Sequence, residues 1–513
     1  MNHKNLLSIP MLLPALLAQG VPLQANATSF PVSRFVIEGN TLLATERLAP
    51  QLDPLRGETR TLDDLLEARK RIESAYREAG YGLVSIGLPR TIDADGTVRL
   101  QVRELPLDAV VITPETPAGD PDRYRNALPS LREGESPNLL RLSRELSLAN
   151  ENPSHGLTVD FAQRDDGIVA EVRVEESSPL KLSLTIDNTG TPETGRTRTG
   201  LIVQHANVFG LDHQATLAYT TSPEKADKVS IAALFYRIPL PALGDSLVFS
   251  ANYSDVDSGR VADLFNISGQ GYGAGAHYIH NLTRSAERRA SLDIGVDRRV
   301  YRDIVDFSGT DIGTQVTTRP LSLQFSTGGR IGKHSYAATL GGARNLPGGD
   351  KNDDAAYAAA RSGASADWRV LRASLHWSYL FGNASLLSLR GEMQHTRDPL
   401  ISGEQFGVGG ARSVRGLKER EISGDRGWLT TAEWLSPPLR EHHRLALFAD
   451  AGHVNRLESP GTPDERAASV GLGWRISGWK GFSLNVDFAR VVHGAGNTEK
   501  GDHRGHLFAM WSL

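Results

Sequence analysis

The stretch GFSLNVDFAR, residues 481–490, alternates apolar and polar side chains along its length. The even-numbered residues from Phe482 to Phe488 are apolar, and the odd-numbered residues between them are polar. A period of two predicts a β-strand with one apolar and one polar face. The same alternation recurs in SLVFSANYSD at 246–255, ASLDIGVD at 290–297 and LLSLRGEMQ at 386–394. We count about sixteen candidate strands after residue 176, many of which alternate in this way, with no convincing helix among them.

This alternation fits both a soluble β-sandwich and a membrane β-barrel, because each removes one face of every strand from water. The run of strands is much longer than an ordinary sandwich and suits a wide barrel. The chain also ends in a strand, RGHLFAMWSL at 504–513, whose apolar residues share one face. We therefore predict α+β repeats followed by an all-β transmembrane barrel of about 16 antiparallel strands over residues 176–513.

The first 27 residues, MNHKNLLSIPMLLPALLAQGVPLQANA, have the order of a secretory signal peptide. A basic start precedes an apolar run from Leu6 to Leu17, and Ala25-Asn26-Ala27 follows as a cleavage site. The alternative is an anchor helix, but Pro10 and Pro14 interrupt a run that is already short for a membrane span. We therefore expect residues 1–27 to be removed on export, and no later apolar run predicts a transmembrane helix.

The composition excludes several classes of protein. The 513 residues include no cysteine, so disulfide bonds cannot hold the chain, and a net charge of -4 does not favour nucleic acid. There is no Walker-type phosphate loop, no HExxH motif and no convincing metal cluster. The glycine-rich residues 269–275 resemble a phosphate loop, but no helix is expected after them, so we assign them to a strand. We expect neither an enzyme nor a cofactor.

Two α/β units of about 70 residues precede the strands and suggest an internal repeat. In the first, residues 32–104, a strand at 32–40 leads to a helix at 63–82 that should stop at Gly80, and a hairpin turns at Asp95-Gly96. The second unit, residues 105–175, repeats this order more loosely. It has a strand at 107–115, a helix at 136–152 and a hairpin turning at Asp166-Gly167.

Three stretches resemble parts of one family: FVIEGNTLL at 35–43, LLRLSRELSLANENPSHGLTVDF at 139–161 and DNTGTPETGRTRTGLIVQHANVFGLDHQATLAYTTS at 187–222. Residues 32–513 as a whole resemble the outer-membrane transporters of two-partner secretion, the TpsB family of the Omp85 superfamily. In that family the first stretch resembles a first POTRA domain and the second resembles a second POTRA domain. The third stretch is the most family-specific and resembles the first barrel strands. The resemblance implies a signal peptide, two POTRA domains and a sixteen-stranded barrel.

The resemblance also assigns a role to the polar, glycine-rich stretch GVGGARSVRGLKEREISGDRG at 407–427. The superfamily carries a Val-Arg-Gly motif at the tip of a loop that folds into the barrel, expected here at 402–426. The matching motif residues are Val414, Arg415 and Gly416. A second motif on a later strand is matched in LALFADAGHV by Phe448, Asp450 and Gly452.

We expect the loop to join the eleventh and twelfth strands and Asp450 to lie on the thirteenth. Since Phe448, Asp450 and Gly452 share one face by alternation, Asp450 should point into the lumen. A guanidinium can bind a carboxylate through two parallel hydrogen bonds, so Arg415 and Asp450 could hold the loop tip against the wall. The alternative is that Val-Arg-Gly is an ordinary exposed tripeptide.

The resemblance implies an outer-membrane translocator of a Gram-negative bacterium with its POTRA domains in the periplasm. It would bind an unfolded exoprotein, such as a large β-helical adhesin, haemolysin or contact-dependent toxin, and export it without ATP. Its other partners would be outer-membrane lipid and the barrel assembly machinery that inserts it. Many family members plug the pore with a helix before the first POTRA domain. The expected mature start, TSFPVSRFVIEGN, leaves no room for one, so the loop alone closes the pore unless cleavage occurs elsewhere.

Two other functions remain open from the sequence. An assembly or insertion factor of the same superfamily would share the POTRA domains and the Val-Arg-Gly loop. A soluble or surface-bound β-rich binding protein would share only the strands, and would be extracted without detergent.

Overall fold

The computed structural model describes residues 7–8, 29–114, 120–164, 167–255, 260–261, 265–266, 270–284, 288–302, 306–307, 310–311, 314–457 and 464–513. The chain divides into two compact units, residues 1–177 with 241–244, and residues 178–240 with 245–513. Apart from the two-residue strand β1 (Leu7–Ser8), the expected signal peptide lies outside the described residues. Within the described ranges, no helix is both long and apolar enough to cross a membrane.

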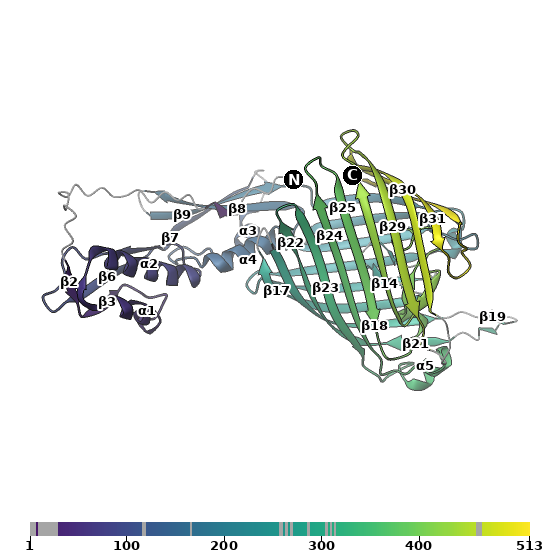
Figure 1. Cartoon of the computed structure of the whole chain (residues 1–513), viewed down its shortest axis with the longest axis horizontal. Helices are drawn as coiled ribbons and strands as arrows, with labels where there is room; N and C mark the ends of the chain where they lie inside the picture. Colours follow the sequence, from purple (N-terminus) through teal and green to yellow (C-terminus); the bar gives the residue numbers. More distant parts are fainter. Residues whose placement is uncertain are drawn as a thin grey trace. The chain divides into compact units, whose positions relative to one another are not determined.

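The first α/β part of the chain folds around helix α2 (Figure 1). Its elements are β2 (Phe30–Val32), β3 (Arg34–Glu38), α1 (Thr45–Leu52), η1 (Asp53–Leu55), β4 (Gly57–Arg60), α2 (Leu62–Glu78), β5 (Val84–Gly87) and β6 (Thr97–Glu104). Strand β6 lies between β3, which is parallel to it, and β5, which is antiparallel. Leu65, Ile72 and Tyr76 are buried because they recur on one face of α2. The helix begins at a capping box formed by Thr61 and Asp64.

The second α/β part has its own buried core. Its elements are β7 (Leu107–Pro114), α3 (Pro121–Ala127), α4 (Leu139–Ala149), β8 (His155–Arg164) and β9 (Gly167–Glu176). The sheet has the order β1-β8-β9-β7. Helix α4 lies within the stretch predicted as helical, whereas α3 is a short helix that the sequence pattern did not predict. Asp166, predicted in the turn between β8 and β9, lies outside the described residues.

The second unit is a closed antiparallel β-barrel. Strands β21 and β22 both pair with β18 and are separated only by Arg319, so together they form one wall strand and the wall has sixteen. The wall strands in chain order are β10 (Leu180–Asp187), β11 (Arg198–Val208), β12 (His213–Thr221), β13 (Ile231–Leu240), β14 (Asp245–Ser254), β17 (Gln270–Arg284), β18 (Arg288–Arg302), β21 (Gln315–Thr318) with β22 (Pro320–Ile331), β23 (His334–Asn345), β24 (Arg369–Leu380), β25 (Leu386–His395), β28 (Arg426–Leu435), β29 (His443–Asn455), β30 (Glu465–Trp479), β31 (Phe482–His493) and β32 (His503–Ser512).

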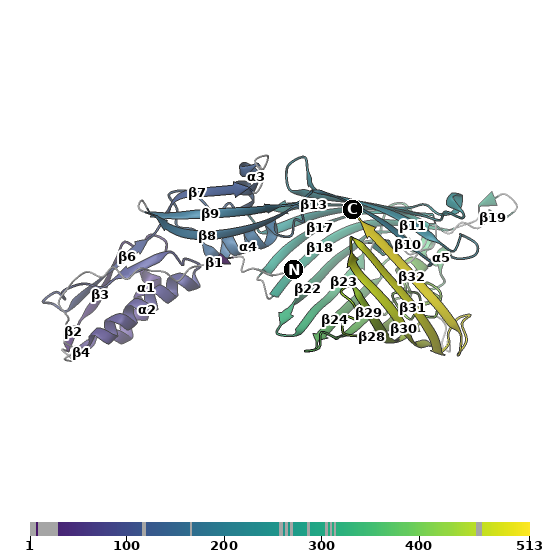
Figure 2. The ribbon, with the colours of Figure 1, turned by 90° about the horizontal axis from the view of Figure 1, so that it is seen from above.

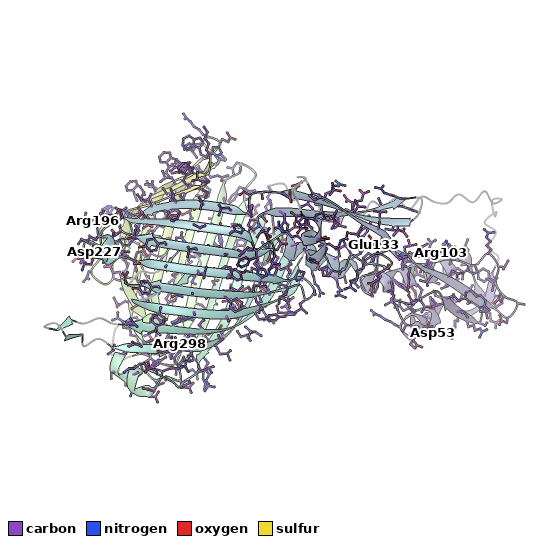
Figure 3. All side chains as sticks on the ribbon, turned by 180° about the vertical axis from the view of Figure 1, so that it is seen from behind. Asp53, Arg103, Glu133, Arg196, Asp227 and Arg298 are labelled. Carbon is purple, nitrogen blue, oxygen red and sulfur yellow. The ribbon has the colours of Figure 1, made fainter. Side chains whose placement is uncertain are left out.

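The barrel closes where its first strand meets its last. Figure 2 shows β10 beside β32, and Leu184 is paired with Trp511 along this seam. Because neighbouring strands are antiparallel, the segments that follow odd-numbered wall strands all lie at one end, here called the long-loop end. Arg196, after the first strand, and Asp227, after the third, are labelled together at this end in Figure 3.

Side chains of the wall alternate between an outer face and a lumen face. On β29, Leu445 and Leu447 are exposed, whereas Phe448 and Asp450 are buried. Large apolar side chains are exposed on the same outer face of other strands, for example Leu472 on β30 and Phe488 on β31. The apolar set therefore faces outward, and the alternate positions face the lumen.

The expectation of no helix after residue 176 is wrong at one place. Helix α5 (Asp354–Ala360) lies between β23 and β24 at the long-loop end, and Asp353 caps it by accepting a hydrogen bond from Ala356 N. Seven residues, five of them alanine, are too few to show a helical period, so the pattern missed it. The remaining short elements are η2 (Ala226–Lys228), β15 (Arg260–Val261), β16 (Phe265–Asn266), β19 (Asp306–Phe307), β20 (Thr310–Asp311), η3 (Ser402–Glu404), β26 (Phe406–Val408) and β27 (Ile422–Gly424).

Candidate functional site at the tip of the inward loop

The segment between β25 and β28, residues 396–425, turns back into the lumen and is here called the inward loop. It contains η3 and the hairpin of β26 and β27, in which Val408 pairs with Ile422. It joins the eleventh and twelfth wall strands, as predicted from the strand count. Residues 409–421 between the hairpin strands carry Val414, Arg415 and Gly416 at the tip.

Arg415 lies against Asp450 on β29, the thirteenth wall strand. Its Nε donates to Oδ2 of Asp450 at 2.8 Å, and its Nη2 donates to Oδ1 at 2.9 Å. The backbone N of Arg415 also donates to Oδ2 at 3.1 Å. The two side chains are 5% and 0% exposed. The carboxylate therefore fixes both the guanidinium and the backbone of the loop tip.

A second set of charges from neighbouring strands surrounds this pair. Nη1 of Arg415 donates to Oε2 of Glu433 on β28 at 2.8 Å and lies 3.6 Å from Oδ1 of Asp487 on β31. Arg475 on β30 contacts the same two carboxylates, at 3.0 and 2.7 Å. Three carboxylates thus share two guanidinium groups, and Arg415 is the only one of the five charges that the loop supplies.

Apolar side chains and glycines let the loop tip approach the wall closely. The Phe448 ring lies under the guanidinium of Arg415, with Cζ 3.3 Å from the ring centroid. Val414 is fully buried in a cluster that joins the loop to β29, β30 and β31. At Gly452, a Cβ atom would stand 2.6 Å from Cγ1 of Val408 and 3.2 Å from Cγ2 of Val414. A residue larger than glycine at position 452 would therefore clash with the loop, which occupies the space that its side chain would need.

The residue after the arginine is held separately. Gly416 has φ +103°, and its backbone N donates to Nε2 of His506 on β32 at 3.1 Å. Since a backbone N–H can only donate, Nε2 of His506 carries the lone pair and the imidazole is neutral in this arrangement. A Cβ at position 416 would stand 2.9 Å from Cγ2 of Val491. Both the backbone conformation and the close wall thus require glycine here.

Side chains of the wall also hold Glu404, near the start of the inward loop, and Asp425, at its end. Glu404 accepts hydrogen bonds from Arg299, Tyr301 and Arg372 at 3.0–3.2 Å for the shortest contact of each. Gln394 on β25 is buried, and its Nε2 donates to the backbone oxygens of Glu404 and Asp425, both at 3.0 Å. One side chain of the wall therefore ties the two ends of the loop together.

The structure brings the six residues singled out in the sequence into one site: Val414, Arg415 and Gly416 from the loop, and Phe448, Asp450 and Gly452 from the wall. Sequence analysis missed Glu433, Arg475, Asp487 and His506. They come from four different strands, and only the strand register places them beside the loop tip. The polar residues in the alternating lumen positions were the available signal, since Asp487 stands in the very stretch that predicted the barrel.

Comparison with known proteins identifies relatives of both units. Residues 166–476 match the family described as haemolysin secretion/activation protein ShlB/FhaC/HecB, and residues 30–104 match the ShlB-type POTRA domain. The outer membrane transporter CdiB of Dickeya dadantii (strain 3937) is 22% identical over 422 residues, which are 80% of this chain and 73% of the relative.

Two solved structures of CdiB share the fold over nearly the whole chain. CdiB from Escherichia coli matches with a TM-score of 0.73 at 16% identity, covering 97% of this chain and 93% of the other. CdiB from Acinetobacter baumannii matches with 0.72 at 16% identity, covering 96% and 93%. BamA from Haemophilus ducreyi lacking POTRA domains 1–3 matches with 0.52 at 14% identity, covering 95% and 100%.

Proposed function

The chain belongs to the ShlB/FhaC/HecB family of two-partner secretion transporters in the Omp85 superfamily, and from this premise we propose how it moves its partner. Family membership makes it an outer-membrane transporter of a secreted partner protein, not an enzyme, with its POTRA region in the periplasm. The proposal concerns the finer steps. The POTRA domains bind the unfolded exoprotein, the barrel lumen conducts it, and the inward loop controls the opening.

The binding step uses free strand edges in the POTRA region. We take residues 32–104 and 105–175 as two POTRA domains, each with a helix beside a small sheet. The two-residue strand β1 pairs along β8, Leu7 with Val159 and Ser8 with Asp160, so this edge accepts an extended segment. When the signal peptide is removed, the edge becomes free for a strand of the exoprotein. Such main-chain pairing tolerates many sequences, as a transporter of a long chain requires.

The translocation step takes place in the lumen. Polar and charged side chains line it, so a passing unfolded chain meets few apolar surfaces that would retain it. Folding of the exoprotein at the cell surface supplies the drive, so the periplasmic side needs no ATP. We take the partner to be a large β-helical adhesin, haemolysin or contact-dependent toxin. Lipid surrounds the outer face, and the barrel assembly machinery inserts the wall.

The observation that carries the gating step is the burial of Arg415 among three wall carboxylates. In its observed position the inward loop fills part of the lumen, so a chain can pass only after the tip leaves this site. We assign to Val414, Arg415 and Gly416 the role of anchor, and to Phe448, Asp450 and Gly452 that of its seat on the wall.

Reconstitution tests the proposal. Purified full-length protein in liposomes is given the denatured exoprotein encoded beside it, with no nucleotide present, and protease added outside reports which chains have entered. The proposal expects protease-protected, folded exoprotein only in liposomes that contain the transporter. Transfer that depends on ATP, or no transfer by correctly oriented protein, contradicts it.

The assembly-factor alternative is tested in cells. Deletion of the gene should abolish secretion of the exoprotein and leave the amounts of other outer-membrane barrels unchanged. The family match favours secretion, since it covers residues 166–476, which include most of the barrel wall. A general loss of outer-membrane barrels would instead favour assembly.

A further inference from the structure

The segment between β23 and β24, residues 346–368, folds over the long-loop end of the barrel and carries helix α5 (Figure 1). Buried polar side chains give it a fixed shape. Nδ2 of Asn345 donates to Oδ1 of Asn352 at 2.7 Å and to the backbone oxygen of Ala366 at 2.6 Å. Nε1 of Trp368 donates to the hydroxyl of Tyr357 at 3.2 Å. The α5 segment is therefore an ordered body rather than a loose connection.

Arg361 extends from this segment to the inward loop. It follows the last residue of α5, and its backbone N donates to the oxygen of Tyr357 at 2.9 Å. Its Nη1 donates to Oδ1 of Asp425 at 2.5 Å and its Nη2 to Oδ2 at 2.9 Å. The side chains are 11% and 0% exposed. This outer ion pair, Arg361–Asp425, has the same two parallel hydrogen bonds as the pair at the loop tip.

Asp425 is the last residue of the inward loop, and its carboxylate joins three separate segments. Besides Arg361, it accepts hydrogen bonds from the backbone N of Leu400 near the start of the loop, at 2.7 Å, and from that of Leu457, which follows β29, at 2.6 Å. Nη1 of Arg361 also donates to the backbone oxygen of Leu400. The α5 segment therefore contacts both ends of the inward loop through one arginine.

Apolar contacts support the same connection. Tyr357 and Trp368 of the α5 segment share a buried cluster with Leu400 and Ile401 at the start of the inward loop. All four have at most 2% of their surface exposed. A displacement of the loop ends would expose this apolar surface and break the outer ion pair together, so the two contacts act as one fastening.

We propose that Arg361 is a positioning residue for transport: it fastens the ends of the inward loop to the α5 segment, and this fastening must be released before the loop can leave the lumen. The inference rests on the proposed function of the loop. The charge that the inward loop supplies has the opposite sign in the outer ion pair and in the ion pair at the tip. The loop supplies the carboxylate at its outer end and the cation at its tip, so each can be tested by itself.

The test measures single-channel openings of the full-length protein in planar bilayers for wild type, Arg361→Ala and Arg361→Lys. We expect Arg361→Ala to raise the open probability about tenfold or more, since it leaves a buried carboxylate without its partner. Arg361→Lys should fall between, because an ammonium cannot form both parallel bonds. The matched control is Arg344→Ala. Arg344 pairs with Asp367 at 2.9 Å in the same region, but both side chains are about half exposed, and openings should stay as in wild type.

Folding is checked by heat-modifiable migration on gels. If Arg361→Ala fails to form a barrel, the charge-reversed double variant Arg361→Asp with Asp425→Arg decides, together with Arg361→Lys. Restored wild-type openings in the double variant support the proposal. A folded Arg361→Ala or Arg361→Lys with wild-type openings overturns it, as does a double variant that folds but keeps raised openings. Failure of the wild type to export the exoprotein would contradict the proposed function alone, because channel openings are measured without any exoprotein.

Discussion

Arg415 and Asp450 meet through two parallel hydrogen bonds of 2.8 and 2.9 Å, although 35 residues separate them in the chain. The pair is buried, and buried ion pairs need further hydrogen bonds to offset the loss of hydration. Here the backbone N of Arg415, Oγ of Ser469 at 3.4 Å and the carboxylate of Glu433 supply them. The contact therefore determines where the loop tip sits more than it stabilises the barrel, whose wall is closed by strand pairing alone.

We predict that Arg415→Ala leaves the barrel folded and frees the loop tip. Removal of one partner of a buried pair costs about 3–5 kcal/mol, because the other charge is left buried without its partner. Channel currents should become larger or more frequent, because the tip no longer has to break this contact before the lumen opens, and secretion of the exoprotein should differ from wild type by about tenfold or more. Quantification of exoprotein in culture medium and planar-bilayer recording measure the two effects.

Lys418→Ala is the control for this variant, because Lys418 is an exposed cation of the same loop. It should secrete as wild type does. Arg415→Lys keeps the positive charge but cannot form both parallel hydrogen bonds to Asp450. Its secretion and currents should therefore lie between those of Arg415→Ala and Lys418→Ala. Export and currents in Arg415→Ala equal to those of Lys418→Ala would remove the anchor from the mechanism.

We predict that Gly416→Ala displaces the loop tip, whereas an alanine at another glycine with positive φ does not. At φ +103° an alanine is strained, and its Cβ would stand 2.9 Å from Val491 and disturb the bond to His506. Gly478→Ala is matched in sign of φ, at +73°, but nothing lies within 4 Å of its Cβ. Only Gly416→Ala should alter channel currents. Equal currents in the two variants would show that the close wall plays no part.

Alternation, the length of the strand run and the final strand predicted the barrel and its count of about sixteen strands. The resemblance to the TpsB family supplied the two motifs whose six residues meet at the loop tip, and each motif lies within a few consecutive residues. The sequence could not predict the contacts among Glu433, Arg475 and Asp487. These contacts depend on the register of strands β28 to β31, which no local pattern specifies. The contact of Arg361 with the inward loop could not be predicted for a second reason, since α5 is too short to show a helical period.

We predict an order among the carboxylates around Arg415. Asp450→Asn should loosen the loop tip most, because Asp450 accepts both parallel bonds and the backbone N of Arg415. Glu433→Gln should have a smaller effect, since Arg415 keeps Asp450 and Arg475 keeps Asp487. Hydrogen exchange of peptides that cover residues 409–421 reports this order by mass spectrometry. Faster exchange in Glu433→Gln than in Asp450→Asn would contradict the assignment of Asp450 as the principal partner.

The first POTRA domain provides a prediction about pH that does not depend on the pore. Burial alone would raise the pKa of Glu104, but hydrogen bonds from Thr41, Tyr76 and Leu42 outweigh it and place the pKa below its usual value. A carboxylate with a lowered folded-state pKa stabilises the fold above its unfolded pKa and loses this contribution as pH falls. Calorimetry of the full chain should therefore show the POTRA transition moving to lower temperature below about pH 4.5.

The variant Glu104→Gln should lower the temperature of this transition at neutral pH and make it depend less on pH, whereas substitution of the exposed Glu58 by Gln should do neither. An unchanged pH dependence in Glu104→Gln would mean that another group causes it.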